Sequence, residues 1–197
     1  MEAALHTHTF NEVKYYLMAT PCSACGKGPR TVDATGPPGK AGEPIIVQIH
    51  CRSCNRQQGI TFCYDHEPPA EEVSAECINP TDEPSRIIDL SQWLGLFYML
   101  AESAWQRDSA PSMRRVDFQA ALCLAEALKF YGDDELPPAS AFSTAEGIAA
   151  FRDHPEKFAR QKLRDMQAKL PTLPTMAPRV ERDKNVSGHK WWKFWKK

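Results

Sequence analysis

Two cysteine pairs with the same spacing constrain this chain more than any other feature of its sequence. Cys22 and Cys25 form the first pair, Cys51 and Cys54 form the second, and twenty-five residues lie between them. Four thiolates arranged in two such pairs complete the tetrahedral shell that zinc prefers and leave no coordination position open. The sequence therefore predicts one structural Zn²⁺ ion held by all four cysteines.

The residue that follows each pair supports the same prediction. Gly26 comes directly after Cys25, and Asn55 comes directly after Cys54. A backbone that wraps around a metal so that its N–H groups point at the sulfurs tends to need a positive φ at this position. Gly and Asn enter that region at the lowest cost. We therefore expect two knuckles of the same geometry.

Segments rich in strand-forming residues flank both pairs. We expect strands at 13–19, 30–35, 45–50 and 59–64, and a loop rich in Gly and Pro at 36–44. Together with the four cysteines, this order resembles the zinc-ribbon superfamily. The resemblance covers residues 10–64 and implies a small three-stranded antiparallel sheet stabilised by its metal. It implies no particular function, because ribbons occur in transcription factors, ribosomal proteins, polymerase subunits, tRNA enzymes and adaptors.

The rest of the chain divides by composition. Residues 65–84 contain seven acidic residues, no basic residue and four prolines, so we expect an acidic linker. Residues 85–170 show helical periodicity and predict a helical bundle or hairpin module, and residues 171–197 predict a disordered, flexible tail that is basic and aromatic. The predicted fold class is α+β: a zinc ribbon at 10–64, the linker, the helical module and the tail.

Caps and breakers give the expected limits of the helices. The first should run from 89 to 107, and the second from a Ser112 cap to Tyr131, with Gly132 ending it. A third helix should start at Ser143 with a capping box to Glu146. A last helix should begin at residues 153–155 and end near 170, before Pro171.

Four basic residues lie close to the cysteine pairs in sequence. Their simplest role is to balance the charge of four thiolates, which is −2 even with a divalent ion bound. They could also form a basic surface for nucleic acid, although residues 1–64 carry only six basic and four acidic residues. The candidate residues are Lys27, Arg30, Arg52 and Arg56.

The remaining cysteines and histidines leave one alternative open. His50, Cys63 and His66 have a spacing that resembles a second metal site, but His50 and Cys63 also fit ordinary positions in strands. Their role cannot be decided from the sequence. Cys123 lies on the apolar face of a predicted helix, where packing explains it better than nucleophilic chemistry does.

The end of the chain combines large aromatic rings with lysines. Such a segment can insert into an anionic membrane surface, stack on single-stranded nucleic acid, dock into a partner protein, or fold back on the body of the protein. The sequence does not decide among these four. The residues are Lys190, Trp191, Trp192, Lys193, Phe194, Trp195, Lys196 and Lys197.

The sequence argues against an enzyme and leaves a zinc-dependent or thiol-based enzyme as a third alternative. There is no HExxH motif, no glycine-rich phosphate loop and no Gly-x-Ser-x-Gly elbow, and the predicted metal site is closed. Glu102, Asp117 and Glu126 have spacings that suit solvated helix faces. The first residues do not have the pattern of a signal peptide, and an odd number of cysteines, seven, favours a reducing compartment, so we expect a cytoplasmic protein.

These observations predict a non-enzymatic, structural-zinc binding protein that acts as a protein–protein adaptor and uses its tail as a tether. The first alternative is a nucleic-acid-associated zinc-ribbon protein. The second is a membrane-surface-associated factor that binds through the Trp/Lys terminus. We predict no small-molecule substrate, and the identity of the partner and the oligomeric state are not encoded in any pattern that we recognise.

Overall fold

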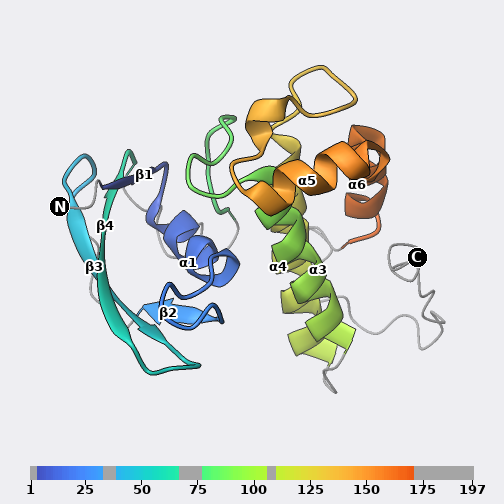
Figure 1. Cartoon of the computed structure of the whole chain (residues 1–197). Helices are drawn as coiled ribbons and strands as arrows, with labels where there is room; N and C mark the ends of the chain where they lie inside the picture. The colour runs from blue at the N-terminus through green and yellow to red at the C-terminus, as the bar shows by residue number, and fades with distance from the viewer. Residues whose placement is uncertain (1–3, 33–38, 67–76, 106–109, 171–197) are drawn as a thin grey trace.

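The computed structural model describes residues 4–32, 39–66, 77–105 and 110–170. We call residues 4–66 the sheet part, residues 77–86 the connecting segment and residues 87–170 the helical part. Helix α1 of the sheet part lies between the sheet and the helices of the helical part (Figure 1). The tail predicted at 171–197 and most of the predicted linker, residues 67–76, lie outside the described residues.

The sheet has four strands in the order β1-β4-β3-β2. The strands β2, β3 and β4 are antiparallel, and β1 adds to β4 in parallel. The predicted three-stranded antiparallel ribbon is therefore not what forms, because a short fourth strand makes the sheet mixed. Strands β3 and β4 confirm the strands predicted at 45–50 and 59–64. The bounds are β1 Leu5–Thr7, β2 Arg30–Val32, β3 Ile45–Cys51 and β4 Gln57–Tyr64.

The strand predicted at 13–19 is wrong, because these residues belong to helix α1, Phe10–Ala19. Val13 and Leu17 face the sheet, while the ring of Tyr15 lies 5.6 Å from that of Trp93 in the helical part. A helix covered on two sides carries apolar residues almost all round, so its sequence lacks the one-sided pattern of a surface helix. That is why a run of β-branched and aromatic residues resembled a strand.

The described helical part contains four α-helices and two short 3₁₀ helices. Helices α3 and α4 pack side by side, and α5 packs against α3 while α6 packs against α4 (Figure 1). Helix α4 begins two residues before the expected Ser112 cap and ends at Leu128, three residues before the predicted end at Tyr131. Gly132, with a φ of 51°, lies four residues beyond the helix. The last predicted helix is divided into η2 and α6. The bounds are α3 Leu90–Trp105, α4 Ala110–Leu128, η1 Ala139–Ala141, α5 Ala145–Asp153, η2 Pro155–Phe158 and α6 Arg160–Gln167.

A buried carboxylate, Asp89, joins the starts of two helices. One of its oxygens accepts the N–H of Gln92 and the hydroxyl of Ser91 in the first turn of α3. The other accepts the N–H and hydroxyl groups of Ser143 and Thr144 before α5. Thr144, not Ser143, is the cap of α5, because its hydroxyl accepts a backbone N–H of the first turn.

Two apolar clusters divide the interior. The larger is centred on α3 and α4 and includes the fully buried Trp93, Phe97 and Leu124, and also Cys123, whose predicted packing role fits its 0% exposure. The smaller lies between the sheet and α1 and consists of Val13, Leu17, Val47, Ile49 and Phe62. Within the described residues, every helix is too short or too polar to cross a membrane.

Candidate metal centre

The four predicted ligands come together at one end of the sheet. Cys22 and Cys25 lie in the turn between α1 and β2, while Cys51 is the last residue of β3 and Cys54 lies in the turn between β3 and β4. Their Sγ atoms all lie within 4.8 Å of one another. The antiparallel pair β2–β3 aligns Arg30 with Cys51 and so holds the two turns next to each other. We call these two turns, residues 21–29 and 51–57, the knuckle end.

The two turns repeat the same backbone pattern. In each, the N–H of the residue after the second cysteine donates to the carbonyl of the first: Gly26 to Cys22 at 2.8 Å and Asn55 to Cys51 at 2.9 Å. The first cysteine in turn donates its N–H one residue further on, to the carbonyl of Lys27 or of Arg56. The φ angles of Gly26 and Asn55 are 66° and 58°. The positive φ predicted at both positions is therefore confirmed.

The spacing of the sulfurs fits a single metal ion. Cys22 Sγ lies 3.8 Å from Cys54 Sγ, and Cys25 Sγ lies 3.7 Å from Cys51 Sγ. Four sulfurs at about 2.3 Å from a central ion form a tetrahedron with edges of about 3.8 Å. None of the seven cysteines is in a disulfide, so all four thiols are available as ligands. The residues present therefore match the donor number, the donor type and the size of such a site.

The acidity of the thiols shows why they need a cation. Backbone N–H groups of Ala24 and Cys25 lower the pKa of Cys22 to about 6, and those of Cys54 and Ser53 outweigh desolvation to lower the pKa of Cys51. The N–H of Arg56 also favours the Cys54 thiolate, but desolvation and the neighbouring cysteines raise its pKa to about 11. The backbone of the knuckle end thus favours the thiolate forms of Cys22 and Cys51, whereas Cys54 ionises readily only when a positive ion is bound.

The four basic candidates do not share one environment. Arg30 is buried, donates its Nε to the carbonyl of Thr20 at 3.1 Å and stacks its guanidinium over Tyr16. Lys27, Arg52 and Arg56 are exposed, and among the described residues none of them forms an ion pair. Arg30 is therefore part of the packing between α1 and β2, and the other three form the basic surface of the knuckle end.

No second metal site forms from the other candidates. Within the part of the chain that the structure describes, the four cysteines are the one group of His, Cys, Asp and Glu side chains close enough to share an ion. His50 is half-buried on β3, Cys63 is buried on β4, and His66 is exposed beyond β4. The metal hypothesis for these three residues gains no support from the geometry.

Sequence reasoning missed a group of buried charges away from the metal. Glu126, expected on a solvated face, is only 3% exposed, and Glu12 and His8 are exposed by 0% and 1%. The capping-box spacing from Thr9 to Glu12 could have located the start of α1, because Glu12 accepts the N–H groups of Thr9 and His8. That His8, Glu12 and Glu126 lie in one region of the molecule can be seen only in the folded structure.

Comparison with known proteins leaves the site to be interpreted from its own geometry. No family model matches the chain, and neither a curated protein nor a solved structure matches it.

Proposed function

We propose that this protein is a non-enzymatic zinc-binding protein, in which one Zn²⁺ ion holds the knuckle end together and the surrounding surfaces bind a partner. The observation that carries the proposal is the four-sulfur cluster itself, with its two matching turns and its 3.7 and 3.8 Å edges. Zinc is favoured over other ions because it accepts four thiolates in tetrahedral geometry without any redox change.

The closed shell is the reason to propose a scaffold rather than a catalyst. A catalytic zinc ion keeps one coordination position for water or substrate, and four cysteine ligands fill every position. The ion would cross-link the two turns. The apolar cluster of the sheet part, with five buried residues in the part of the chain that the structure describes, contributes little stability of its own. Partner binding by the exposed surfaces is then the function that the zinc supports.

Metal analysis of the purified full chain tests this proposal. We expect close to one zinc ion per chain, and its loss in the double variant Cys22→Ser/Cys51→Ser. The variant Cys63→Ser is the matched control, because Cys63 lies outside the cluster, and it should keep the metal. Iron in place of zinc, or metal retained in the double variant, would overturn the zinc assignment.

The open face of the sheet supports a protein partner. The register of the strands places one set of side chains away from α1, and this set contains no Asp, Glu, Lys or Arg. Ile46 stands among them with 69% of its surface exposed. Depletion of charge around an exposed apolar residue is typical of the central region of protein interfaces. The set is His6, Thr31, Ile46, Gln48, His50, Gln57, Gly59, Thr61 and Cys63.

A charged substitution on this face tests the adaptor proposal. In a pull-down with full-length protein, Ile46→Lys should reduce the yield of the bound protein at least tenfold while leaving the zinc content unchanged. The matched control is Ile148→Lys, since Ile148 is 52% exposed on α5 in the helical part. Equal loss in both variants, or no loss in either, would contradict a role for the open face.

Nucleic-acid binding is the second candidate, and the charge distribution of the sheet part favours it. Three exposed cations of the sheet part, Lys27, Arg52 and Arg56, lie at the knuckle end, whereas the exposed Lys14 and Lys40 lie on α1 and before β3. The described acids Glu43 and Asp65 lie beyond the opposite end of the sheet, next to the start of β3 and the end of β4. Three cations that lie away from the exposed acids of the described sheet part fit a phosphate backbone.

Salt dependence distinguishes this candidate. If three phosphate contacts form, the binding constant for a single-stranded oligonucleotide should fall with salt with a logarithmic slope of about −2, and Arg52→Gln/Arg56→Gln should weaken it. Arg164→Gln is the control, because Arg164 is exposed on α6 in the helical part. Absence of measurable binding at low salt would remove the nucleic-acid candidate and leave the protein partner.

The membrane alternative depends on residues 190–197, which the structure does not describe. It stays a prediction, tested by flotation of anionic liposomes with the full chain and with a chain ending at Leu170. Equal flotation of the two would contradict it.

A further inference from the structure

The four clustered cysteines differ in their access to solvent. Cys22 and Cys51 are buried, with 4% and 2% of their surfaces exposed, and Cys25 is half-buried. Cys54 is the exposed member of the cluster. A reagent that arrives from solvent therefore reaches Cys54 more readily than it reaches the other three ligands.

Two cations flank Cys54 along the chain. Arg52 and Arg56 lie two residues before and two residues after it, and both are exposed. Positive charges near a cysteine favour its thiolate, which is the form that reacts with oxidants. Cysteines that are oxidised selectively are typically exposed, lie in a positively charged environment and have a second cysteine beside them.

The second cysteine is Cys22. Its Sγ lies 3.8 Å from Cys54 Sγ, and the other short contact of the cluster joins Cys25 Sγ and Cys51 Sγ at 3.7 Å. Each of these contacts connects one turn of the knuckle end to the other. Because a disulfide bond is about 2.05 Å long, the sulfurs of Cys22 and Cys54 need to approach each other by less than about 2 Å to form one.

The remaining cysteines do not share these properties. Cys63 and Cys123 are buried, and Cys77 is half-buried in the connecting segment. None of the three belongs to the cluster of four. Among the described residues, Cys54 is therefore the exposed cysteine that has a second thiol beside it.

We propose that Cys54 is an oxidation site for hydroperoxides and that Cys22 is its resolving cysteine, so that a disulfide between the two turns forms and the zinc ion is released. This inference rests on the proposed function, because it describes a regulation of the same zinc site.

The reaction with hydrogen peroxide proceeds in two displacements. The Cys54 thiolate attacks the O–O bond, so that an S–O bond forms and hydroxide leaves. The Cys22 thiolate then attacks the sulfur of the resulting sulfenic acid, so that the S–S bond forms and a second hydroxide leaves. Two protons from solvent convert both hydroxides to water. The two sulfurs supply both electrons, and the two thiols that remain, Cys25 and Cys51, are too few to complete a structural zinc site.

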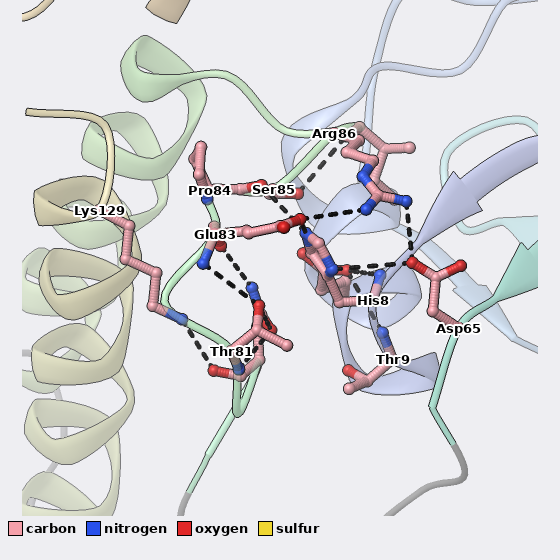
Figure 2. A network of polar contacts seen from close by, with 12 residues as sticks. His8, Thr9, Asp65, Thr81, Glu83, Pro84, Ser85, Arg86 and Lys129 are labelled. Atoms are coloured by element: carbon pink, nitrogen blue, oxygen red, sulfur yellow. Dashed lines mark hydrogen bonds and ion pairs between the residues drawn. The ribbon is translucent and has the colours of Figure 1, made fainter. Parts of the chain in front are cut away.

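The opposite end of the sheet is fastened without the metal. Just beyond β4, Asp65 accepts from Arg86 of the connecting segment at 2.8 Å, and Arg86 also binds Glu83 at 3.1 Å (Figure 2). The hydroxyl of Thr9 donates to the carbonyl of Ile78 at 2.6 Å. We therefore expect oxidation to act at the knuckle end and to leave the bonds between the sheet part and the connecting segment in place.

Titration of the zinc-loaded full chain with hydrogen peroxide tests the proposal. A chromophoric chelator should report the loss of one zinc ion for each disulfide formed, and dithiothreitol with added zinc should restore the site. Trypsin cleaves after Arg52 and Arg56, so it separates Cys54 from Cys51. Mass spectrometry without reduction should find peptide 53–56 linked to peptide 15–27, and fragmentation should place the link at Cys22.

The products decide between the possible disulfides. A link from peptide 53–56 to the peptide that contains Cys51, a link between Cys22 and Cys25, or zinc release without any disulfide would overturn the proposal. A chain that holds no zinc before peroxide is added would contradict the proposed function and this inference with it. A zinc-loaded chain that keeps its metal in peroxide would contradict the oxidation site alone.

Trapping with dimedone, which reacts with sulfenic acids, identifies the sulfur that is oxidised first. In the unmodified chain the label should appear on Cys54, and a label on Cys22 in its place would reverse the two roles and contradict the proposal. The unmodified chain is used because Cys54→Ser removes a metal ligand. Cys77→Ser is the matched control, since it removes a half-buried cysteine outside the cluster. It should release zinc at the rate of the unmodified chain, and a large decrease in that rate would place the oxidation at Cys77.

Discussion

The sheet part and the helical part differ in what holds them together. Twenty buried residues form the apolar cluster centred on α3 and α4, against five in the cluster between the sheet and α1, among the described residues. The helical part therefore has a core large enough to stabilise it by burial. The sheet part has at one end a cluster of four cysteines of the size that a metal ion needs, and it packs against the helical part through α1. We therefore expect two kinds of stabilisation in one chain, metal binding in the sheet part and burial in the helical part.

Removal of the metal should have the largest effect on this comparison. A structural zinc ion supplies about 10 kcal/mol or more of apparent folding free energy in small metal-stabilised units. With a chelator, we expect loss of amide protection in β3 and β4, while α3 and α4 keep theirs. Hydrogen–deuterium exchange of the full chain measures both at once. Cooperative loss of both parts would show that α1 couples them into one unit.

Acid should have the next largest effect, because the sheet part and the helical part should lose stability at different pH values. Protons displace zinc from thiolates, so the sheet part loses stability as pH falls through the range in which the metal is released. In the helical part, burial alone would raise the pKa of Asp89, but hydrogen bonds from Ser91, Gln92, Ser143 and Thr144 hold it below its ordinary value. Its contribution is present above the ordinary value and is lost only as pH falls through the lowered one.

Circular dichroism and tryptophan fluorescence, followed from pH 7 to pH 2, measure this order. The sheet signal and the bound zinc should be lost at a higher pH than the environment of Trp93, which is buried in the helical part. Loss of the Trp93 signal before the zinc would reverse the comparison.

The helical part has its own weak point at Asp89. The change Asp89→Ala leaves several buried donors before α3 and α5 without an acceptor and should cost about 3 kcal/mol of unfolding free energy. Asp153→Ala is the control, because Asp153 is exposed and pairs only with its neighbour Arg152, so it should change stability by less than about 0.5 kcal/mol. Chemical denaturation of the zinc-loaded protein measures both. A similar cost in the two variants would show that the Asp89 bonds add nothing specific.

The smallest effect is expected from the backbone of one knuckle. Asn55 has a φ of 58°, so Asn55→Ala should cost about 1 kcal/mol, or about fivefold in zinc affinity, whereas Asn55→Gly should be nearly neutral. Competition with a chromophoric chelator measures the affinities. Equal affinities for the two variants would mean that the positive φ is not what limits metal binding.

Some features of the fold were predicted correctly from the sequence and others were not, and the difference has physical reasons. Some features depend on short-range chemistry that a few adjacent residues determine. These are the four clustered cysteines, the positive φ after each pair, and the strands β3 and β4. Helix α1 was mistaken for a strand because both of its faces are buried, against the sheet through Leu17 and against the helices through Tyr15. No local pattern in the sequence shows that the sheet covers one face of α1 and that the helices cover the other.

Glu126 and His8 show the same limit for the charged groups. Glu126 sits at a helix position that suits solvent, and only the packing of the connecting segment and α1 against α4 removes it from water. His8, Asp65 and Arg86 come from three distant segments, so no spacing in the sequence brings them together. The approach of such groups is decided by how the parts pack.

By itself, then, the sequence predicted the four clustered cysteines, the geometry of their two turns and the helices among the described residues between 90 and 167. These depend on interactions between neighbours along the chain. The tertiary structure alone decided that the sheet is mixed, that α1 lies between two clusters and that Glu12 and Glu126 are buried together. Those features depend on which distant surfaces exclude water from one another, and burial of that kind has no local signature.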